Sequence, residues 1–268
     1  MSIRFAHNHA FGHHQEGLFM NIKVVVLNTA GGVGKSTFAK HCLSSLIPNS
    51  VSIAIEDWNS GAGKVDLEMS AKSFYSLATQ LNTDDEQSFV IDIGTSNSKQ
   101  MLQHFADLSL TCEQIDFWVI PVRVGAKERI DTLKTISKLL EINVDPAKIV
   151  VIVQAVADID QFDQEFKPLV DAARESGFVF AKQAVLFNQV FDLIKGSDRS
   201  VFEIVEARPD FKKLRAQNHG DEQKLVQIGH DMLIYSLAQT ACRNLLAVFQ
   251  STPLYTAVTQ KAESCEAV

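Results

Sequence analysis

The sequence predicts an α/β fold, in which a doubly wound, mainly parallel sheet carries helices on both faces. Two observations lead to this fold. Continuous apolar runs of strand length recur along the chain, which is typical of strands buried on both faces. Stretches with apolar residues at helical spacing separate these runs, which is the pattern of strands joined by crossover helices. No repeat or Pro-rich linker divides the chain, so we expect a single domain over residues 20–250.

The expected strands are runs rich in Val, Ile and Phe. In chain order they cover residues 22–28, 51–56, 89–93, 117–122 and 149–153, with a weaker run at 178–187. The expected helices cover residues 126–141, 161–176 and 222–249. Each of these helices carries apolar residues at spacings of three or four, which predicts that one face of the helix packs on the core.

The two ends of the chain differ from the rest. Residues 1–19 hold four histidines scattered among Asn, Gly and Phe, namely His7, His9, His13 and His14. Binding of a transition metal is one interpretation of this segment. We favour a flexible leader that need not be native, with Met20 as the functional start, because the histidines follow no period and no second cluster accompanies them. Residues 251–268 are expected to form a loose tail.

The composition is that of an ordinary globular protein. Of the 268 residues 46% are hydrophobic and 21% are charged. The net charge of −7 argues against a protein that coats nucleic acid, although a local basic patch is compatible with it. The four cysteines are far apart and form no Cys-x-x-Cys pair, which favours free thiols in a reducing cytosol. No apolar run reaches the roughly 18–20 residues of a membrane span and no secretory segment is visible, so we expect a cytoplasmic protein.

A glycine-rich loop directly follows the first expected strand and opens a helical pattern. Its residues are Gly31, Gly32, Val33, Gly34, Lys35, Ser36 and Thr37. Glycines let backbone N–H groups converge on an anion, and the helix N-terminus adds partial positive charge. We expect Lys35 to reach the β- and γ-phosphates and Ser36 to join a Mg²⁺ shell. A glycine turn that binds nothing is the alternative, which Gly-Lys-Ser-Thr after a buried strand disfavours. The sequence thus predicts ATP or ADP and Mg²⁺ as cofactors.

Two acidic positions at strand ends complete the predicted site. Asp92 lies near the end of the run 89–93, where it would hold Mg²⁺ through water as a Walker B acid does. The alternative for Asp92 is a cap on the next loop. Asp57, in Glu56-Asp57-Trp58-Asn59, is the first choice for a carboxylate that orients the attacking water, with Glu56 second. A solvated turn acid is the alternative at Asp57. The predicted catalytic set is therefore Lys35, Asp57 and Asp92, and the metal ligands are Ser36 and Asp92.

In their order along the chain, these features resemble the ParA/MinD-type ATPases over about residues 20–210. The opening Leu-Asn-x-x-Gly-x-Val-Gly-Lys-Ser is also similar to the StbB-type plasmid stability and conjugation branch. One departure concerns Thr29 and Ala30, which stand where that family has Gly-Lys. The family's lysine touches the partner's phosphates across a dimer that sandwiches ATP, and Ala30 carries no charge. The resemblance therefore implies a weak ATPase unless another cation, such as Lys64 or Arg123, takes that role.

The resemblance also implies binding residues and partners. Besides the loop with Ala30, the nucleotide would contact Gln154 and Asn188 near its base. An ATP-dependent homodimer and a DNA-binding adaptor protein are the implied partners. Non-specific DNA would bind a basic cluster, unless this cluster is only a solvated face: Arg208, Lys212, Lys213 and Arg215. The implied function is an ATP-driven switch in DNA partition, plasmid stability or conjugative transfer.

Two other functions are open at this point. A small-molecule kinase or ligase would use the same loop, but it needs an acceptor pocket and an Arg-rich lid, and no Arg-rich lid segment stands out. A scaffold that binds nucleotide without hydrolysing it is compatible with Ala30.

Overall fold

A single parallel sheet organises the part of the chain that the structure describes. The computed structural model describes residues 21–56, 67–69, 73–157 and 162–266. Seven parallel strands follow the order β3-β2-β4-β1-β5-β6-β7. Their bounds are β1 (Lys23–Val26), β2 (Ser50–Ile55), β3 (Leu67–Met69), β4 (Ser88–Ile93), β5 (Phe117–Val122), β6 (Ile149–Val153) and β7 (Val179–Phe180). Strands β2–β4 lie to one side of β1 and β5–β7 to the other, which confirms the predicted doubly wound sheet.

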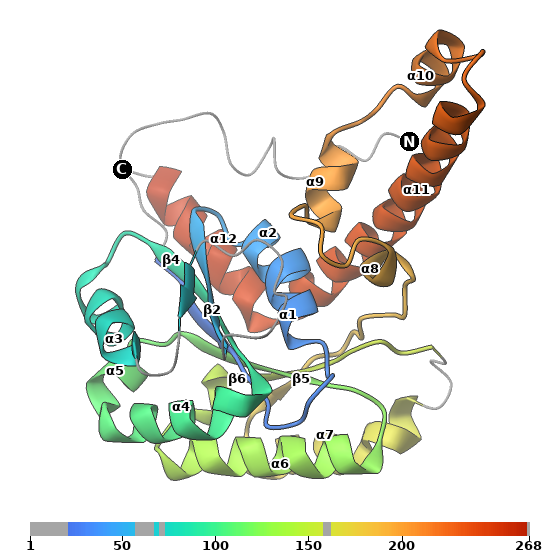
Figure 1. Ribbon diagram of the computed structural model, residues 1–268. Coiled ribbons are helices and arrows are strands. Elements are labelled where there is room, and N and C mark those ends of the chain that lie inside the picture. The colour runs from blue at the N-terminus through green and yellow to red at the C-terminus, as the bar shows by residue number, and fades with distance from the viewer. Residues whose placement is uncertain (1–20, 57–66, 70–72, 158–161, 267–268) are drawn as a thin grey trace.

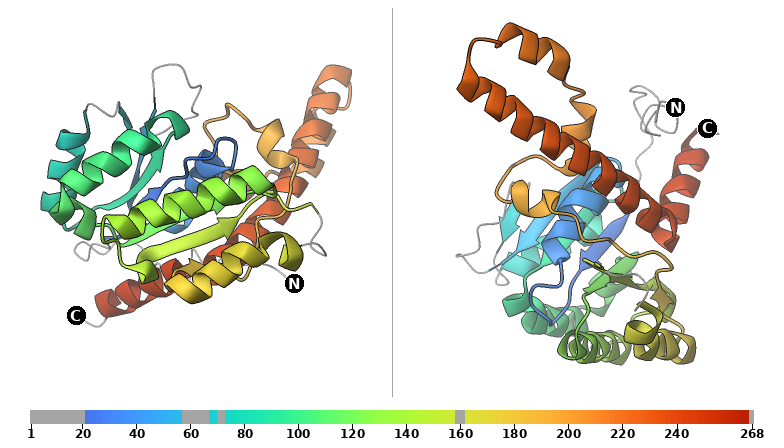
Figure 2. Two further views of the ribbon diagram at one scale, coloured as in Figure 1. Left: turned by 90° about the horizontal axis from the view of Figure 1, so that it is seen from below. Right: turned by 90° about the vertical axis from the view of Figure 1, so that its right-hand side faces the viewer.

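Helices cover both faces of the sheet (Figures 1 and 2). One face packs against α3 (Phe74–Thr83), α4 (Thr95–Asp107), α5 (Ser109–Glu113), α6 (Ala126–Glu141) and α7 (Phe162–Ser176). The other packs against α1 (Lys35–Phe38), the π-helical turn η2 (Ala39–Leu43), α8 (Val190–Leu193), α9 (Val201–Glu206), α11 (Glu222–Gln250) and α12 (Pro253–Glu266). The short elements α2 (Ser44–Leu46), η4 (Pro146–Lys148) and α10 (Phe211–Gln217) complete the chain.

Strand β1 shows how the sequence divides the core into two layers. Val25 belongs to the cluster under α3–α7, whereas Val24 and Val26 belong to the cluster on the opposite face. Successive side chains of a strand point to opposite faces, so a continuous run of valines can serve both clusters. This is the arrangement that the uninterrupted apolar runs predict.

The end of the chain corrects one expectation. Residues 253–266 form helix α12 and not the loose tail predicted from residue 251. Pro253 is the first residue of the helix, a position where the missing N–H of proline costs nothing. Leu254 and Val258 are 0% and 2% exposed and pack into the second core cluster. These two residues, four apart, lie on one face of the helix and dock it on the core, together with the partly buried Ala257.

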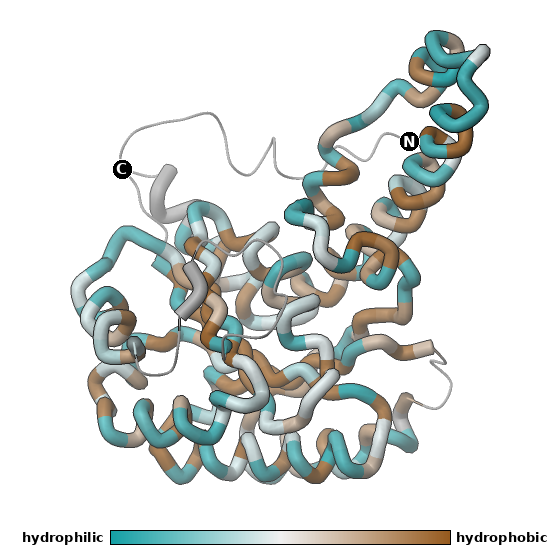
Figure 3. The backbone as a smooth tube through the Cα atoms, viewed as in Figure 1, coloured by the Kyte–Doolittle hydropathy of each residue, from teal (hydrophilic) through white to brown (hydrophobic). Residues whose placement is uncertain are grey.

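Helix α11 extends beyond the body of the protein. Before Ala238 only Ile228 is buried in this helix, and from Ala238 onward its apolar side packs in the core. The N-terminal part of α11 and the short α10 project away from the sheet (Figure 1), and Figure 3 shows mixed polar and apolar residues along them. Phe211 of α10 meets Tyr235 of α11 edge to face, with ring centroids 5.5 Å apart. We call residues 208–237 the arm.

By length and composition alone, α11 is also apolar enough to cross a membrane, and among the described helices it alone is. The sequence was expected to hold no such segment. In the structure one third of its most apolar window is buried. Its C-terminal part belongs to the core of an α/β domain, and core helices of soluble proteins pass the same test.

Candidate nucleotide-binding site

The glycine-rich loop runs from the end of β1 to the start of α1. Gly32 and Gly34 have φ angles of 68° and 86°, in the left-handed region that favours glycine. Gly34 is also the N-cap residue of α1, and because glycine has no side chain it cannot accept a hydrogen bond from the first turn of the helix. The first-turn N–H groups of the helix that begins at Lys35 are thus left for another hydrogen-bond acceptor. This is the geometry of an anion site at a helix N-terminus.

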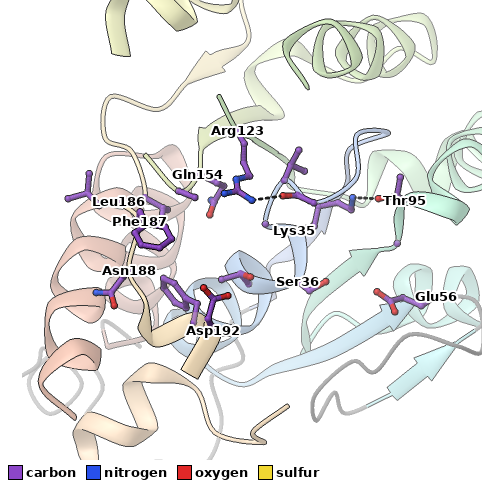
Figure 4. A pocket seen from close by; sticks show the side chains of 18 residues that line it. Lys35, Ser36, Glu56, Thr95, Arg123, Gln154, Leu186, Phe187, Asn188 and Asp192 are labelled. Carbon is purple, nitrogen blue, oxygen red and sulfur yellow. Dashed lines mark hydrogen bonds between the residues drawn. The ribbon is translucent and has the colours of Figure 1, made fainter. Parts of the chain in front are cut away.

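Lys35 lies under this loop. Its side chain is only 7% exposed. The ammonium donates to the carbonyl oxygens of Asn28 (3.2 Å) and Ala30 (3.0 Å) and to Oγ1 of Thr95 (2.6 Å, Figure 4). Burial lowers the pKa of Lys35, and the nearby charge of Asp92 partly opposes this. A buried ammonium held by neutral oxygens is well suited to receive an anion.

Asp92 lies beside the loop, one residue before the end of β4. It is 7% exposed, and burial raises its pKa to about 6 against the effects of a hydrogen bond with Ser36 and the charge of Lys35. The Oδ1 atom of Asp92 is buried and has no hydrogen-bond partner. A carboxylate oxygen and a hydroxyl are ligands that Mg²⁺ prefers. The predicted pair of Ser36 and Asp92 is therefore brought together, and these residues fit a Mg²⁺ ion.

A cavity of about 510 Å³ opens above the loop at the carboxyl edge of the sheet (Figure 4). Its lining comes from the loop, from residues that follow the strands β2, β4, β5 and β6, from the segment 185–188 and from α8. The lining residues are Gly32, Val33, Gly34, Lys35, Ser36, Thr37, Glu56, Gly94, Thr95, Arg123, Gln154, Ala155, Val185, Leu186, Phe187, Asn188, Phe191 and Asp192. In doubly wound sheets this edge is where ligands bind.

Most of the predicted loop residues line this cavity, with two exceptions. Ala30 is 5% exposed, and its N–H donates to the side chain of Asn28 (2.9 Å). It lies beneath the loop and brings no charge to the cavity. Gly31 lines a smaller cavity of about 370 Å³, which shares Gly32, Arg123 and Ala155 with the larger one.

Gln154 follows β6 and packs directly on the loop. It is 3% exposed, its Nε2 has no hydrogen-bond partner, and a Cβ atom on Gly34 would lie 3.2 Å from its Oε1. The structure thus gives a second reason for glycine at position 34. Gln154 lines the cavity, and its predicted contact with the base stays a prediction.

Asn188 lines the cavity but uses its amide within the chain. Its Nδ2 donates to the carbonyl of Leu237 (3.2 Å), and its Oδ1 accepts from the N–H of Val190 (2.9 Å). Figure 4 shows the side chain directed towards α11. Next to it, Leu186 and Phe187 are 45% and 57% exposed at the rim of the cavity. Their apolar surface suits the face of a base better than the engaged amide does.

Asp57 and Lys64 lie outside the described residues, so their predicted roles stay predictions. Glu56, the second choice, lies after β2 and lines the cavity.

Sequence reasoning missed Thr95 altogether and named Arg123 only as a stand-in cation. Thr95 begins α4 and holds the Lys35 ammonium, and its place just after Asp92 and Gly94 is the signal that was available. Arg123 follows β5 and donates from NH1 to the carbonyl of Gly32 (3.2 Å).

No protein-family model and no curated protein sequence matches the chain. Solved structures do resemble its backbone. MinD of Aquifex aeolicus in complex with MinC shares 12% identity at a TM-score of 0.46, over 70% of this chain and 89% of that one. An ATP complex of a variant of McdA from Cyanothece shares 13% sequence identity at a TM-score of 0.46, and the match covers 80% of this chain and 97% of that one. MinD of Pyrococcus horikoshii OT3 in complex with Mg-ADP shares 13% sequence identity at a TM-score of 0.44, and the match covers 82% of this chain and 96% of that one.

Proposed function

We propose that this protein is an ATP-binding switch of the ParA/MinD type that hydrolyses ATP slowly. The observation that carries the proposal is the meeting of Lys35, Ser36 and Asp92 at the end of the glycine loop, where Asp92 keeps one buried oxygen without a partner. A buried group in that state is costly unless a ligand completes it. A nucleotide with Mg²⁺ is the ligand that would do so.

Each residue has a defined task in this proposal. The loop N–H groups and Lys35 bind the phosphates, while Ser36 and Asp92 hold the metal ion. When bound, Mg²⁺ would neutralise charge on the phosphate oxygens. Asp57, or Glu56 at the cavity wall, orients the attacking water. Turnover is slow because Ala30 supplies no cation that could reach a partner's phosphates across a dimer.

The biological role rests on the resemblance in sequence order. We place the protein in the cytoplasm, where ATP drives formation of a homodimer that works with a DNA-binding adaptor. Its task is DNA partition, plasmid stability or conjugative transfer, and the StbB-type branch fits the loop opening. ATP hydrolysis to ADP then releases the partners.

Replacing the loop lysine tests the switch directly. We expect Lys35→Ala to weaken ATP binding by about 10- to 100-fold, since it removes charged hydrogen bonds to phosphate. Light scattering should show a dimer of the unaltered protein with Mg²⁺ and ATP, but not with ADP or without nucleotide, and no dimer of Lys35→Ala in any of these states. Lys134→Ala, at an exposed position of α6, is the matched control and should dimerise normally.

Two results would contradict the proposal. Absence of nucleotide binding would remove its basis. A monomer in every state, with nucleotide bound, would favour a small-molecule kinase if a phosphoryl group reaches a metabolite, and a scaffold if no turnover occurs.

The arm supports a contact with DNA. Its basic residues Lys212, Lys213 and Arg215 are exposed on α10, and Arg208 is exposed just before it. The arm carries them away from the body of an acidic protein (Figure 1). Such a placement lets a few cations approach a phosphate backbone at a distance from the acidic surface of the body, and Asp210, Asp221 and Glu222 of the arm partly offset their charge.

Removal of two of these cations should change the salt dependence of DNA binding. We expect Lys212→Ala with Lys213→Ala to weaken binding and to lower the slope of log K against log salt by about 1.8, because each phosphate that is no longer neutralised lowers it by about 0.9. Fluorescence anisotropy with a DNA duplex at several salt concentrations measures this slope. Lys134→Ala with Lys138→Ala on α6 removes the same charge elsewhere and should leave the slope unchanged. An equal slope for the arm variant would place the DNA-binding surface elsewhere.

A further inference from the structure

The cavity above the loop holds two basic side chains among its described lining residues, Lys35 and Arg123. They differ in setting. Lys35 is buried under the loop, whereas Arg123 is exposed and follows the last residue of β5. Figure 4 shows Arg123 beside Gln154, while the Lys35 ammonium points away from them to Thr95. The loop therefore has a cation on each side.

The charge of Arg123 is little used within the described part of the chain. There its guanidinium makes a single exposed hydrogen bond, to the neutral carbonyl of Gly32, and takes part in no ion pair. Arg129, six residues later, shows the contrast, because it forms an ion pair with Glu165. A solvent-exposed bond to a carbonyl is easily exchanged for a charged acceptor, to which an arginine binds more strongly.

The position of Arg123 along the loop indicates which part of a nucleotide it would meet. Its hydrogen-bond partner Gly32 adjoins Gly31, where a Cβ atom would lie 3.9 Å from Oγ1 of Thr95. Thr95 is also the group that holds the Lys35 ammonium. The first half of the loop is therefore the end at which Lys35 meets the phosphates. The exposed Phe187 marks the rim that suits the base.

We propose that Arg123 binds the terminal phosphate of ATP, exchanging the Gly32 carbonyl for phosphate oxygens, and so makes the site distinguish ATP from ADP. The guanidinium presents a planar fork of N–H donors that matches phosphate oxygens. ADP lacks the terminal phosphate, so with ADP bound the Arg123 guanidinium would keep its hydrogen bond to the carbonyl of Gly32. This inference rests on the proposed nucleotide binding, and it adds the residue through which the switch distinguishes its two states.

Calorimetric titration of the full chain in Mg²⁺ tests the proposal, with ADP and with an ATP analogue whose terminal bridge resists hydrolysis. We expect Arg123→Ala to weaken binding of the analogue about tenfold or more, as removal of a charged hydrogen bond does, and binding of ADP by less than about twofold. Arg123→Lys should bind the analogue with an affinity between those of the unaltered protein and Arg123→Ala, since lysine keeps the charge but lacks the planar set of N–H donors. Arg174→Ala, an exposed position on α7 away from the cavity, should bind both nucleotides as the unaltered protein does.

The outcomes separate this inference from the proposed function. If the unaltered protein binds neither nucleotide, the proposed function fails and the role of Arg123 fails with it. If it binds both and Arg123→Ala changes neither affinity, or lowers the two equally, the nucleotide site stands and the assignment of Arg123 to the terminal phosphate is overturned. Because Arg123 is exposed, an unchanged thermal unfolding curve for each variant shows that folding is not the cause.

Discussion

Replacing Asp92 by asparagine should make the nucleotide-free protein more stable, by ~3 kcal/mol of unfolding free energy at pH 8. The carboxylate is 7% exposed and its Oδ1 has no partner. Burial raises its pKa from 3.8 to about 6. A shift of about two units corresponds to ~3 kcal/mol of cost for holding the charged form in the folded state. Asparagine has nearly the same shape and no charge. Urea unfolding followed by circular dichroism measures the difference.

The sign of the effect with pH follows from the direction of this shift. The pKa of Asp92 is higher in the folded than in the unfolded chain. Its contribution to stability is thus fully present below about pH 3.8 and is lost as the pH rises through about 6. The advantage of Asp92→Asn should therefore be near zero below pH 4 and complete above pH 7. Asp171→Asn is the control, since an ion pair with Lys167 lowers the pKa of that exposed carboxylate.

Asp92→Asn should also remove most of the stabilisation that Mg²⁺ and ATP give to the folded protein. In the unaltered protein, Mg²⁺ and ATP should raise the thermal unfolding temperature, because they bind only the folded state. Asp92→Asn should show little of this rise, since a neutral amide is a poorer magnesium ligand than a carboxylate. Greater stability without ligand and less response to it would mark Asp92 as a residue kept for function. An asparagine variant that is less stable at every pH would contradict this view.

The parts of the fold that the sequence predicted are those set by local pattern. Strand β6 consists of β-branched residues alone and β1 has three valines after Lys23, and such runs favour buried strands. Strand β3 has three residues at the sheet edge and offers no such run. Helix α12 was missed because its segment holds few large apolar residues, and Leu254 and Val258 are buried on a core that is built by distant parts of the chain.

The candidate site divides in the same way. Lys35 and Ser36 were predictable because their spacing follows from one loop, and Asp92 because a strand end at this edge of the sheet faces that loop. Thr95 and Arg123 reach the loop from two different strands, so only the strand order places them together. The engagement of Asn188 by α11 joins residues 49 apart in sequence and has no local signal.

Replacing His41 by leucine should make the protein more stable in acid, by ~3 kcal/mol near pH 4 relative to pH 8. His41 lies in the π-helical turn after α1, is 7% exposed and has no hydrogen-bond partner for Nδ1. Its ring contacts that of Phe191 at 5.4 Å between centroids. Burial, aided by the charge of Lys40 and opposed by Glu203, lowers its pKa from 6.5 to about 4. The folded state therefore requires the neutral ring.

For His41 the pH dependence has the opposite sign to that of Asp92. Its folded pKa is lower than its unfolded pKa, so its contribution to stability is present above pH 6.5 and is lost as the pH falls through about 4. As the pH falls from about 6.5 to 4, the stabilising contribution of Asp92 increases while that of His41 decreases. In the unaltered protein these two changes in unfolding free energy nearly cancel. In each single variant, the unfolding free energy should therefore change with pH as the remaining residue dictates. His41→Leu should grow more stable on acidification, and Asp92→Asn less stable.

The double variant decides whether these two residues account for the slopes. Asp92→Asn with His41→Leu should remove both slopes, so that its unfolding free energy between pH 4 and 7 runs parallel to that of the unaltered protein. His230→Leu, at an exposed position of the arm, controls for the removal of an imidazole. If His41→Leu followed the unaltered protein through this range, the ring would have to be charged or solvated in the folded state. Its burial against Phe191 argues that it is neither, because a charged imidazole without a partner there would cost more free energy than the ring contact provides.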